Sequence, residues 1–237
     1  MPENKAYVLI LAGGSGKRMG AGINKVFLPL SGVPILIRSI APFTGFCQGA
    51  VLSVPEEEIP LARELLTRYG LSRFVLQVVP GGRERQESAA NALAAVPKDG
   101  EFILIHDGAR PLVTEEIIRK ALLSAREFGS GIASVPVVDT IKVADSSGWI
   151  TQTPDRSRLF AMQTPQAFRA EIIRKAHEAP GDFLATDDAQ LAEHAGFRVH
   201  LSEGVRENLK ITQPMDLQLA ELILKNREER QKKGETK

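Results

Sequence analysis

Short, continuous apolar runs recur along the first two-thirds of the chain. They read YVLIL from Tyr7, AVLSV from Ala50, FVLQVV from Phe74, FILIH from Phe102 and GIASVPVV from Gly131. Each run is apolar throughout instead of alternating with polar residues, which is typical of strands buried on both faces. The pattern therefore predicts a set of internal strands.

Helical patterns lie between these runs. The segment EEEIPLARELLTRYG places Leu61, Leu65 and Leu66 on one face of a helix. The segment TEEIIRKALLSAREFG begins at Thr114, a residue type that caps helices, and ends at Gly129. Because strand and helix alternate, we expect an α/β fold: one domain over residues 1–237, with a mostly parallel, twisted, Rossmann-like sheet flanked by helices. The charged tail KNREERQKKGETK is expected to fray.

One segment interrupts the alternation. Two extended runs, Thr140–Val143 and Trp149–Thr151, surround the turn ADSSG, which predicts a β-hairpin arm over residues 139–158. A hairpin with few apolar residues buries little surface by itself. We therefore expect the arm to project and to pack on a second subunit.

Composition limits the class of protein. Hydrophobic residues make up 43% of the 237 residues and charged residues 25%, as in ordinary globular proteins. The net charge of +1 gives no support for nucleic acid or an anionic membrane as partner, so any anion site has to be local. A single cysteine, Cys47, excludes an internal disulfide, and the N-terminal apolar run is too short for a signal peptide. These features predict a cytoplasmic protein.

A glycine loop, GGSGKRMG, follows the first predicted strand. The dinucleotide fingerprint requires a third glycine where the chain has Met19, and the P-loop requires a glycine at Leu11 and a hydroxyl at Arg18. Glycines that let backbone N–H groups approach a phosphate, with Lys17 and Arg18 to neutralise it, remain a physical possibility. The alternative is a tight turn with two solvated cations.

Further polar segments follow other predicted strands. Gly13–Arg18, Gly81–Arg85 and Asp107–Arg110 each come directly after an apolar run. Ligands of open parallel sheets bind beyond the carboxyl ends of the strands, so these segments should share one edge. Several cations beside glycine-rich backbone predict a polyphosphate site.

The order of these motifs resembles that of a known family. LAGGSGKRMG…NKVFLPLSGVPIL resembles the opening of sugar-phosphate nucleotidylyltransferases. Together with GGRERQES, HDGARP, VPVVDTIK, TPQAF, TDDA and NLKIT in this order, it is similar to the 2-C-methyl-D-erythritol 4-phosphate cytidylyltransferases over residues 6–225. The chain departs from the usual family pattern where it has Asn24-Lys25-Val26 in place of Pro-Lys-Gln, and Gly108 in place of alanine.

The resemblance implies a reaction and a set of roles. CTP and 2-C-methyl-D-erythritol 4-phosphate would give a CDP-alcohol and pyrophosphate, with Mg²⁺ as cofactor and a homodimer as the assembly. Arg18 and Lys25 match the cations that stabilise the transition state, and for each the alternative is a surface charge. The residues implied for the nucleotide are Ala12, Gly13, Gly14, Ser15, Gly16, Gly81, Gly82, Ser88, Asp107 and Arg110.

The acceptor and the metal are assigned in the same way. The residues implied for the acceptor are Thr140, Arg156, Thr164, Thr186 and Lys210. Thr140 and Arg156 lie on the predicted arm, which the resemblance implies crosses to the partner subunit. Asp107 could ligate Mg²⁺ or simply cap the turn that follows it. His106 is interpreted as a packed histidine, and Asp187 and Asp188 as the first turn of a helix.

Two other functions stay open at this point. A ribitol-5-phosphate cytidylyltransferase would share the reaction but take another acceptor. A non-catalytic nucleotide-binding protein on the same fold would need no acceptor cations, whereas the chain has Arg156 and Lys210.

Overall fold

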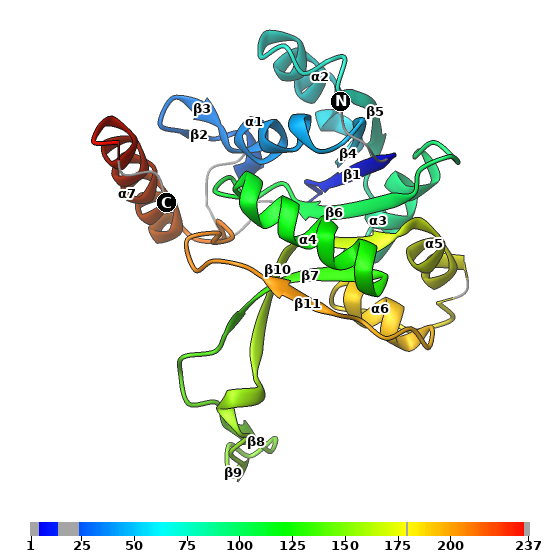
Figure 1. The fold of residues 1–237 in the computed structure, drawn as a ribbon, viewed down its shortest axis with the longest axis vertical. Helices are drawn as coiled ribbons and strands as arrows, with labels where there is room; N and C mark the ends of the chain where they lie inside the picture. The colour runs from blue at the N-terminus through cyan, green and yellow to red at the C-terminus, as the bar shows by residue number, and fades with distance from the viewer. Residues whose placement is uncertain (1–4, 14–23, 179, 235–237) are drawn as a thin grey trace.

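The computed structural model describes residues 5–13, 24–178 and 180–234. A seven-stranded sheet forms its centre, helices cover both faces, and a narrow arm leaves the sheet at one end (Figure 1). In spatial order the strands are β11 (Leu201–Glu203), β7 (Ser130–Pro136), β10 (Phe160–Arg169), β6 (Phe102–Asp107), β1 (Ala6–Leu11), β4 (Gly49–Val54) and β5 (Val75–Pro80). The helices are α1 (Ile35–Ile40), α2 (Ile59–Arg68), α3 (Arg85–Ala94), α4 (Glu115–Phe128), α5 (Ala170–Glu178), α6 (Asp188–His194) and α7 (Pro214–Lys232).

The sheet is parallel except around one strand. β6, β1, β4 and β5 pair in parallel, and so do β7 and β11, whereas β10 runs antiparallel between β6 and β7. The predicted α/β class with a mostly parallel sheet is confirmed. Residues Thr164–Gln166 of the TPQAF motif lie inside β10, where the pairing with β7 shifts register.

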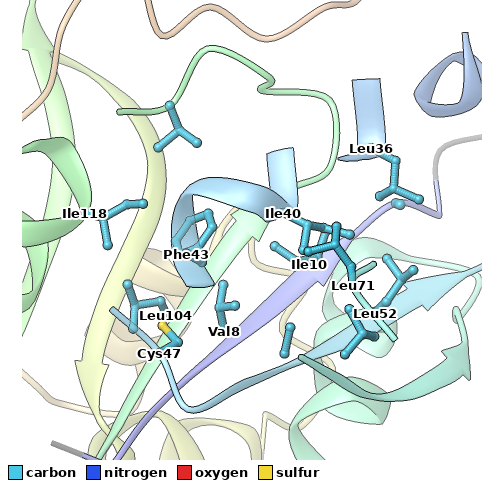
Figure 2. Close-up of a cluster of buried hydrophobic side chains, with 14 of the residues drawn as sticks. Val8, Ile10, Leu36, Ile40, Phe43, Cys47, Leu52, Leu71, Leu104 and Ile118 are labelled. Carbon is cyan, nitrogen blue, oxygen red and sulfur yellow. The ribbon is translucent and has the colours of Figure 1, made fainter. Parts of the chain in front are cut away.

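The two faces of β1 supply two separate cores. Val8 and Ile10 pack with Phe43 and with α1, α2 and α4 on one face (Figure 2). Leu9 and Leu11 pack on the other face, with α3, α5 and α6. Because successive side chains of a strand point to opposite faces, a continuous apolar run is what a strand covered on both sides requires.

Local signals explain where several elements begin and end. The Thr114 side chain accepts a hydrogen bond from the Ile117 backbone N–H, and Gly129 ends α4 in the left-handed conformation (φ 89°), so both predicted caps are confirmed. Two other expectations are wrong. β5 is an edge strand with Leu76 exposed, and in α2 Leu61 faces solvent while Ala62 is buried.

The C-terminal tail is also more ordered than predicted, because α7 continues to Lys232. Gln213 and Asp216 form a capping box at its start, and Pro214 occupies the first turn. Ala220 is buried against Leu30 and Leu112. Packing of the first turns nucleates a helix that the charged sequence then continues.

The arm is a hairpin that projects away from the sheet (Figure 1). Its strands β8 (Val143–Ala144) and β9 (Ile150–Gln152) pair antiparallel and are shorter than the predicted runs. A 3-10 turn, η5 (Arg156–Arg158), leads back to β10. The hairpin itself is confirmed.

Candidate active site

The carboxyl ends of β1, β5 and β6 meet at one edge of the sheet, as the spacing of the motifs predicts. The Gly108 backbone N–H donates to the Leu11 carbonyl at 2.8 Å, and the Gly81 backbone N–H donates to the Val54 carbonyl at 2.8 Å. A Cβ on Gly108 would lie 3.0 Å from the Ala12 Cβ, so the loops after β1 and β6 approach closely. This edge brings Ala12, Gly13, Gly81 and Asp107 together.

Ser88, at the start of α3, organises the glycine turn beside it. Its hydroxyl accepts a hydrogen bond from the Gly82 backbone N–H (3.0 Å) and donates to the Glu84 carbonyl (3.1 Å). A Cβ on Gly13 would lie 3.5 Å from this hydroxyl oxygen, and one on Gly81 would lie 3.3 Å from it. The Ser88 side chain therefore lies against the backbone of both glycine segments.

Four charged side chains gather at the same edge of the sheet, and we call them the rim cluster: Arg85, Asp107, Arg110 and Lys210. The distances to the Asp107 carboxylate are 3.0 Å from Lys210 Nζ, 3.5 Å from Arg110 Nε and 3.8 Å from Arg85 Nε. Burial raises the pKa of the Asp107 carboxyl, but Lys210, Arg85 and Arg110 outweigh it and lower the pKa to about 2. Asp107 is therefore ionised near neutral pH, and the cluster has an excess of positive charge.

A second buried carboxylate anchors this cluster, and sequence reasoning missed it. Asp188, at the start of α6, lies 2.6 Å from Arg85 Nη1 and 3.2 Å from His177 Nε2. Burial raises the pKa of the Asp188 carboxyl, but Arg85 and His177 lower it overall. The adjacent Asp187 caps α6 as predicted, since its side chain accepts from the Gln190 backbone N–H. The only sequence signal for Asp188 was helix-start composition, which does not reveal a partner on α3.

The NLKIT segment brings Lys210 to Asp107. Asn208 is buried and donates to the Thr164 carbonyl (2.9 Å), and its own carbonyl accepts from Arg110 Nη1 (2.8 Å). The Ile211 backbone N–H donates to the Ala109 carbonyl at 2.8 Å. Lys210, which the resemblance implies for the acceptor, thus directly contacts Asp107, which it implies for the nucleotide.

The two other body residues expected to face the acceptor have different surroundings. Thr164 is buried, and its hydroxyl accepts from the Asp107 backbone N–H at 3.0 Å. Thr186 is exposed, and its hydroxyl donates to Gln190 Oε1 at 3.1 Å. Only Thr186 presents its side chain at the surface.

Thr140 and Arg156 are exposed. Both belong to the arm, which projects away from the sheet (Figure 1). Arg156 Nη1 donates to the Val138 carbonyl, within the arm, at 2.6 Å. The fold of one chain therefore does not bring Thr140 and Arg156 to the other predicted site residues.

The first predicted loop is described only at its ends. Gly14, Ser15, Gly16 and Arg18 lie outside the described residues. Lys25 begins the 3-10 turn η2 (Lys25–Phe27), whose cap is the Asn24 side chain. Burial raises the pKa of the nearby Asp216 carboxyl, but hydrogen bonds from Thr212 and Gln213 and the charge of Lys25 lower it.

The described part of the chain offers no ready-made metal cage. Within it, no group of three or more His, Cys, Asp and Glu side chains is placed to hold an ion. Asp107 is the one carboxylate of the rim cluster. Mg²⁺ that is bound through substrate phosphates needs only one or two protein carboxylates. The residues present fit a magnesium ion that arrives with a triphosphate. No helix in the described ranges is long and apolar enough to cross a membrane.

Comparisons with known proteins cover nearly the whole chain. The family described as 2-C-methyl-D-erythritol 4-phosphate cytidylyltransferase matches residues 6–226. A protein of that name from Geobacter metallireducens is 46% identical over 229 residues, which span 93% of this chain and 98% of the relative. One from Bacillus cereus is 42% identical over 224 residues, which span 92% and 98%.

Solved structures give the same result. The structure of 4-diphosphocytidyl-2C-methyl-D-erythritol synthase from Anaerococcus prevotii superposes with a TM-score of 0.82 at 26% identity, covering 94% of this chain and 99% of that one. The structure of 2-C-methyl-D-erythritol 4-phosphate cytidylyltransferase from Thermus thermophilus has a TM-score of 0.74 at 30% identity, covering 91% and 97%.

Proposed function

This chain belongs to the 2-C-methyl-D-erythritol 4-phosphate cytidylyltransferase family, and we propose that the rim cluster and the glycine segments around it carry the cytidylyl transfer. The enzyme transfers a cytidylyl group from CTP to 2-C-methyl-D-erythritol 4-phosphate, in isoprenoid precursor synthesis. The ribitol-5-phosphate alternative is not favoured, because the relatives carry the erythritol name over almost their full length.

The reaction needs positioning and charge stabilisation more than proton transfer. A phosphate oxygen of the acceptor forms a bond to the α-phosphorus of CTP, the bond from that phosphorus to the bridging oxygen breaks, and pyrophosphate leaves. The attacking phosphate is already ionised near neutral pH, so no general base is required. Arg18 and Lys25 stabilise the charge that builds on the phosphoryl oxygens in the transition state.

The nucleotide binds beside Ser88. Ala12 to Gly16 approach the triphosphate through backbone N–H groups, while Gly81, Gly82 and Ser88 read the cytosine. The close approach of the Gly13 and Gly81 backbone to the Ser88 hydroxyl supports a small base, and a pyrimidine is smaller than a purine. The Asp107 and Arg110 side chains lie next to the triphosphate of the bound nucleotide. Asp107 would be the protein ligand of a Mg²⁺ ion that arrives with CTP, and the bound ion would neutralise part of the triphosphate charge.

The acceptor binds across two subunits of a homodimer. Lys210, Thr186 and Thr164 lie on the body, whereas Thr140 and Arg156 lie on the arm, so a partner's arm completes the site. The observation that carries the proposed cytidylyl transfer is the rim cluster, in which three cations converge on one buried carboxylate.

Pyrophosphate release tests the function directly. We expect turnover with CTP and 2-C-methyl-D-erythritol 4-phosphate, and much less with ATP, GTP or ribitol 5-phosphate. Equal turnover with ATP would contradict the assignment of Gly81, Gly82 and Ser88 to the cytosine. A preference for ribitol 5-phosphate would contradict the assigned acceptor.

Two substitutions test the transition-state cations. Arg18→Ala and Lys25→Ala should each lower kcat by roughly 10²–10³-fold, the usual effect of removing one preorganised charge. Lys120→Ala is the matched control, because Lys120 forms ion pairs with Glu116 and Glu203 on the surface of α4 and β11. If the alanine variant at Arg18 or Lys25 keeps the same kcat as this control, the residue at that position is only a surface charge.

A further inference from the structure

His106 is buried directly behind the rim cluster and has no role in the proposed mechanism. It is the penultimate residue of β6, none of its surface is exposed, and its ring lies 5.0 Å from the Phe43 ring, centroid to centroid. A packed core residue in this position would normally be apolar, because a buried imidazole needs partners for both nitrogens. The presence of a histidine therefore requires an explanation.

Both ring nitrogens contact residues that shape the site. His106 Nδ1 lies 3.0 Å from the Thr164 hydroxyl, and Nε2 lies 3.3 Å from the Arg110 carbonyl. The same Thr164 hydroxyl accepts the Asp107 backbone N–H at 3.0 Å. The imidazole thus bridges the two ends of the turn from Asp107 to Arg110, which is closed by the Arg110 N–H donating to the Asp107 carbonyl.

The hydrogen bonds determine the tautomer. The Arg110 carbonyl can only accept, so Nε2 has to carry a proton. The Thr164 hydroxyl already accepts from Asp107, and Nδ1 is the acceptor available for its proton. With this tautomer, each polar atom in the hydrogen-bonded series from the Asp107 N–H through the Thr164 hydroxyl and the His106 ring to the Arg110 carbonyl has a partner. A second proton on the ring would remove the acceptor for the Thr164 hydroxyl proton.

We propose that His106 is a positioning residue for cytidylyl transfer, which fixes Asp107 through the Thr164 hydroxyl and fixes Arg110 through its carbonyl. The inference rests on the proposed function of those two residues. It also gives Thr164 a part in the site that does not depend on contact with the acceptor. A displacement of charged groups at a phosphoryl-transfer site by about 1 Å is enough to reduce the rate up to a hundred-fold.

Three substitutions at one position separate the two contacts. His106→Asn keeps an acceptor near Nδ1, His106→Gln keeps a donor near Nε2, and His106→Phe keeps only the ring packing. We expect His106→Phe to lower kcat/KM about 10- to 100-fold, and each amide variant to lose less. Thr164→Ser, which keeps the hydroxyl, should lose much less than Thr164→Val.

Phe43→Leu is the control for a purely structural effect. It disturbs the packing of His106 but none of its hydrogen bonds, so it should lower the melting temperature and leave kcat and KM unchanged at a temperature where it is folded. If Phe43→Leu loses as much kcat/KM as His106→Phe, or if folded His106→Phe stays within about two-fold of wild type, the positioning role is wrong.

A spectroscopic test does not depend on activity. Long-range proton–nitrogen spectra of the wild type should assign to His106 a protonated Nε2 and a bare Nδ1, with the signal identified by its loss in His106→Phe. The opposite tautomer, or a doubly protonated ring near neutral pH, would overturn the hydrogen-bond chain. Absence of cytidylyl transfer in the wild type would instead contradict the proposed function.

Discussion

Asp107 and Arg156 are both expected to face substrate, yet their surroundings differ. The Asp107 carboxylate is buried among three cations, and its backbone N–H is held by Thr164. Arg156 is exposed on the arm, and its guanidinium donates to a carbonyl of that same arm. The fold thus holds Asp107 in a buried cluster of charges, whereas it leaves Arg156 exposed on the arm.

The apolar side chains of the arm point to the same difference. Trp149 is 75% exposed and Ile150 is 62% exposed, whereas β1, β4 and β6 bury all of their apolar side chains. Exposed aromatic and aliphatic residues that lie together commonly mark a protein interface. The contrast supports an arm that packs on a second copy of the chain. It can be tested by substitutions on the arm and in the rim cluster.

Among the tests of this contrast, the largest effect is expected from a substitution on the arm. Arg156→Ala should raise KM for the acceptor and barely change the affinity for CTP, because the arm is proposed to reach the acceptor only. A lost charge-assisted contact costs about 1.5–3 kcal/mol, or roughly ten- to more than a hundred-fold in binding. Steady-state kinetics with each substrate varied in turn measure KM for the acceptor and for CTP separately. An equal rise in KM for CTP would contradict the prediction.

Mixed dimers then decide which subunit the arm serves. Arg156→Ala and Lys25→Ala protomers should regain about a quarter of wild-type activity when they are mixed and assayed at a low acceptor concentration, where each variant alone is nearly inactive, because half the dimers are mixed and each has one intact site of two. If mixed dimers form and no activity returns, the arm serves its own subunit.

An effect of intermediate size concerns acid stability. The pKa of Asp107 is about 2 in the folded protein, against 3.8 for an ordinary aspartate, so folding favours its ionised form. This contribution, about 2 kcal/mol, is present above pH 4 or so and is lost as the pH falls through the folded pKa. Asp107→Asn should therefore flatten the fall in the free energy of unfolding between about pH 5 and about pH 2, as measured by urea unfolding.

An aspartate on the arm provides the matched control. Asp155 also has a lowered pKa, because its side chain accepts hydrogen bonds from Ser157, but it is fully exposed. Solvent screens such a group, so Asp155→Asn should change the pH dependence far less. Equal flattening by the two variants would show that burial within the rim cluster has no special effect.

The sequence predicted the elements whose signals are local. β1, β4 and β6 are continuous apolar runs, and Thr114 and Gly129 end α4 by their own backbone preferences. The glycine segments that follow β1 and β5 were expected at one edge of the sheet, because the carboxyl ends of parallel strands lie at the same edge. These features need no knowledge of distant partners.

The features that the sequence did not predict depend on contacts between distant segments. β10 contains polar residues and Pro165, yet it pairs on both sides because β6 and β7 lie on either side of it. The pairs Arg85–Asp188 and Asp107–Lys210 join segments that follow different strands, so no spacing in the sequence encodes them. The arm's role also stays a prediction, because it depends on a second chain.

The smallest expected effect on stability sharpens the comparison most. Trp149→Ser removes the most exposed of the arm's large apolar side chains, so the free energy of unfolding of the monomer should change by no more than about 0.5 kcal/mol, as for surface substitutions generally. The same change should weaken dimerisation measurably in sedimentation experiments, because aromatic side chains at an interface contribute disproportionately to binding. Met215→Ser, on α7, is the control, since Met215 is 69% exposed but lies on the body. If Met215→Ser weakens the dimer and Trp149→Ser does not, the interface lies on α7 instead of the arm. If Trp149→Ser instead destabilises the monomer, the arm packs on its own subunit, and the contrast between a completed rim cluster and an incomplete arm fails.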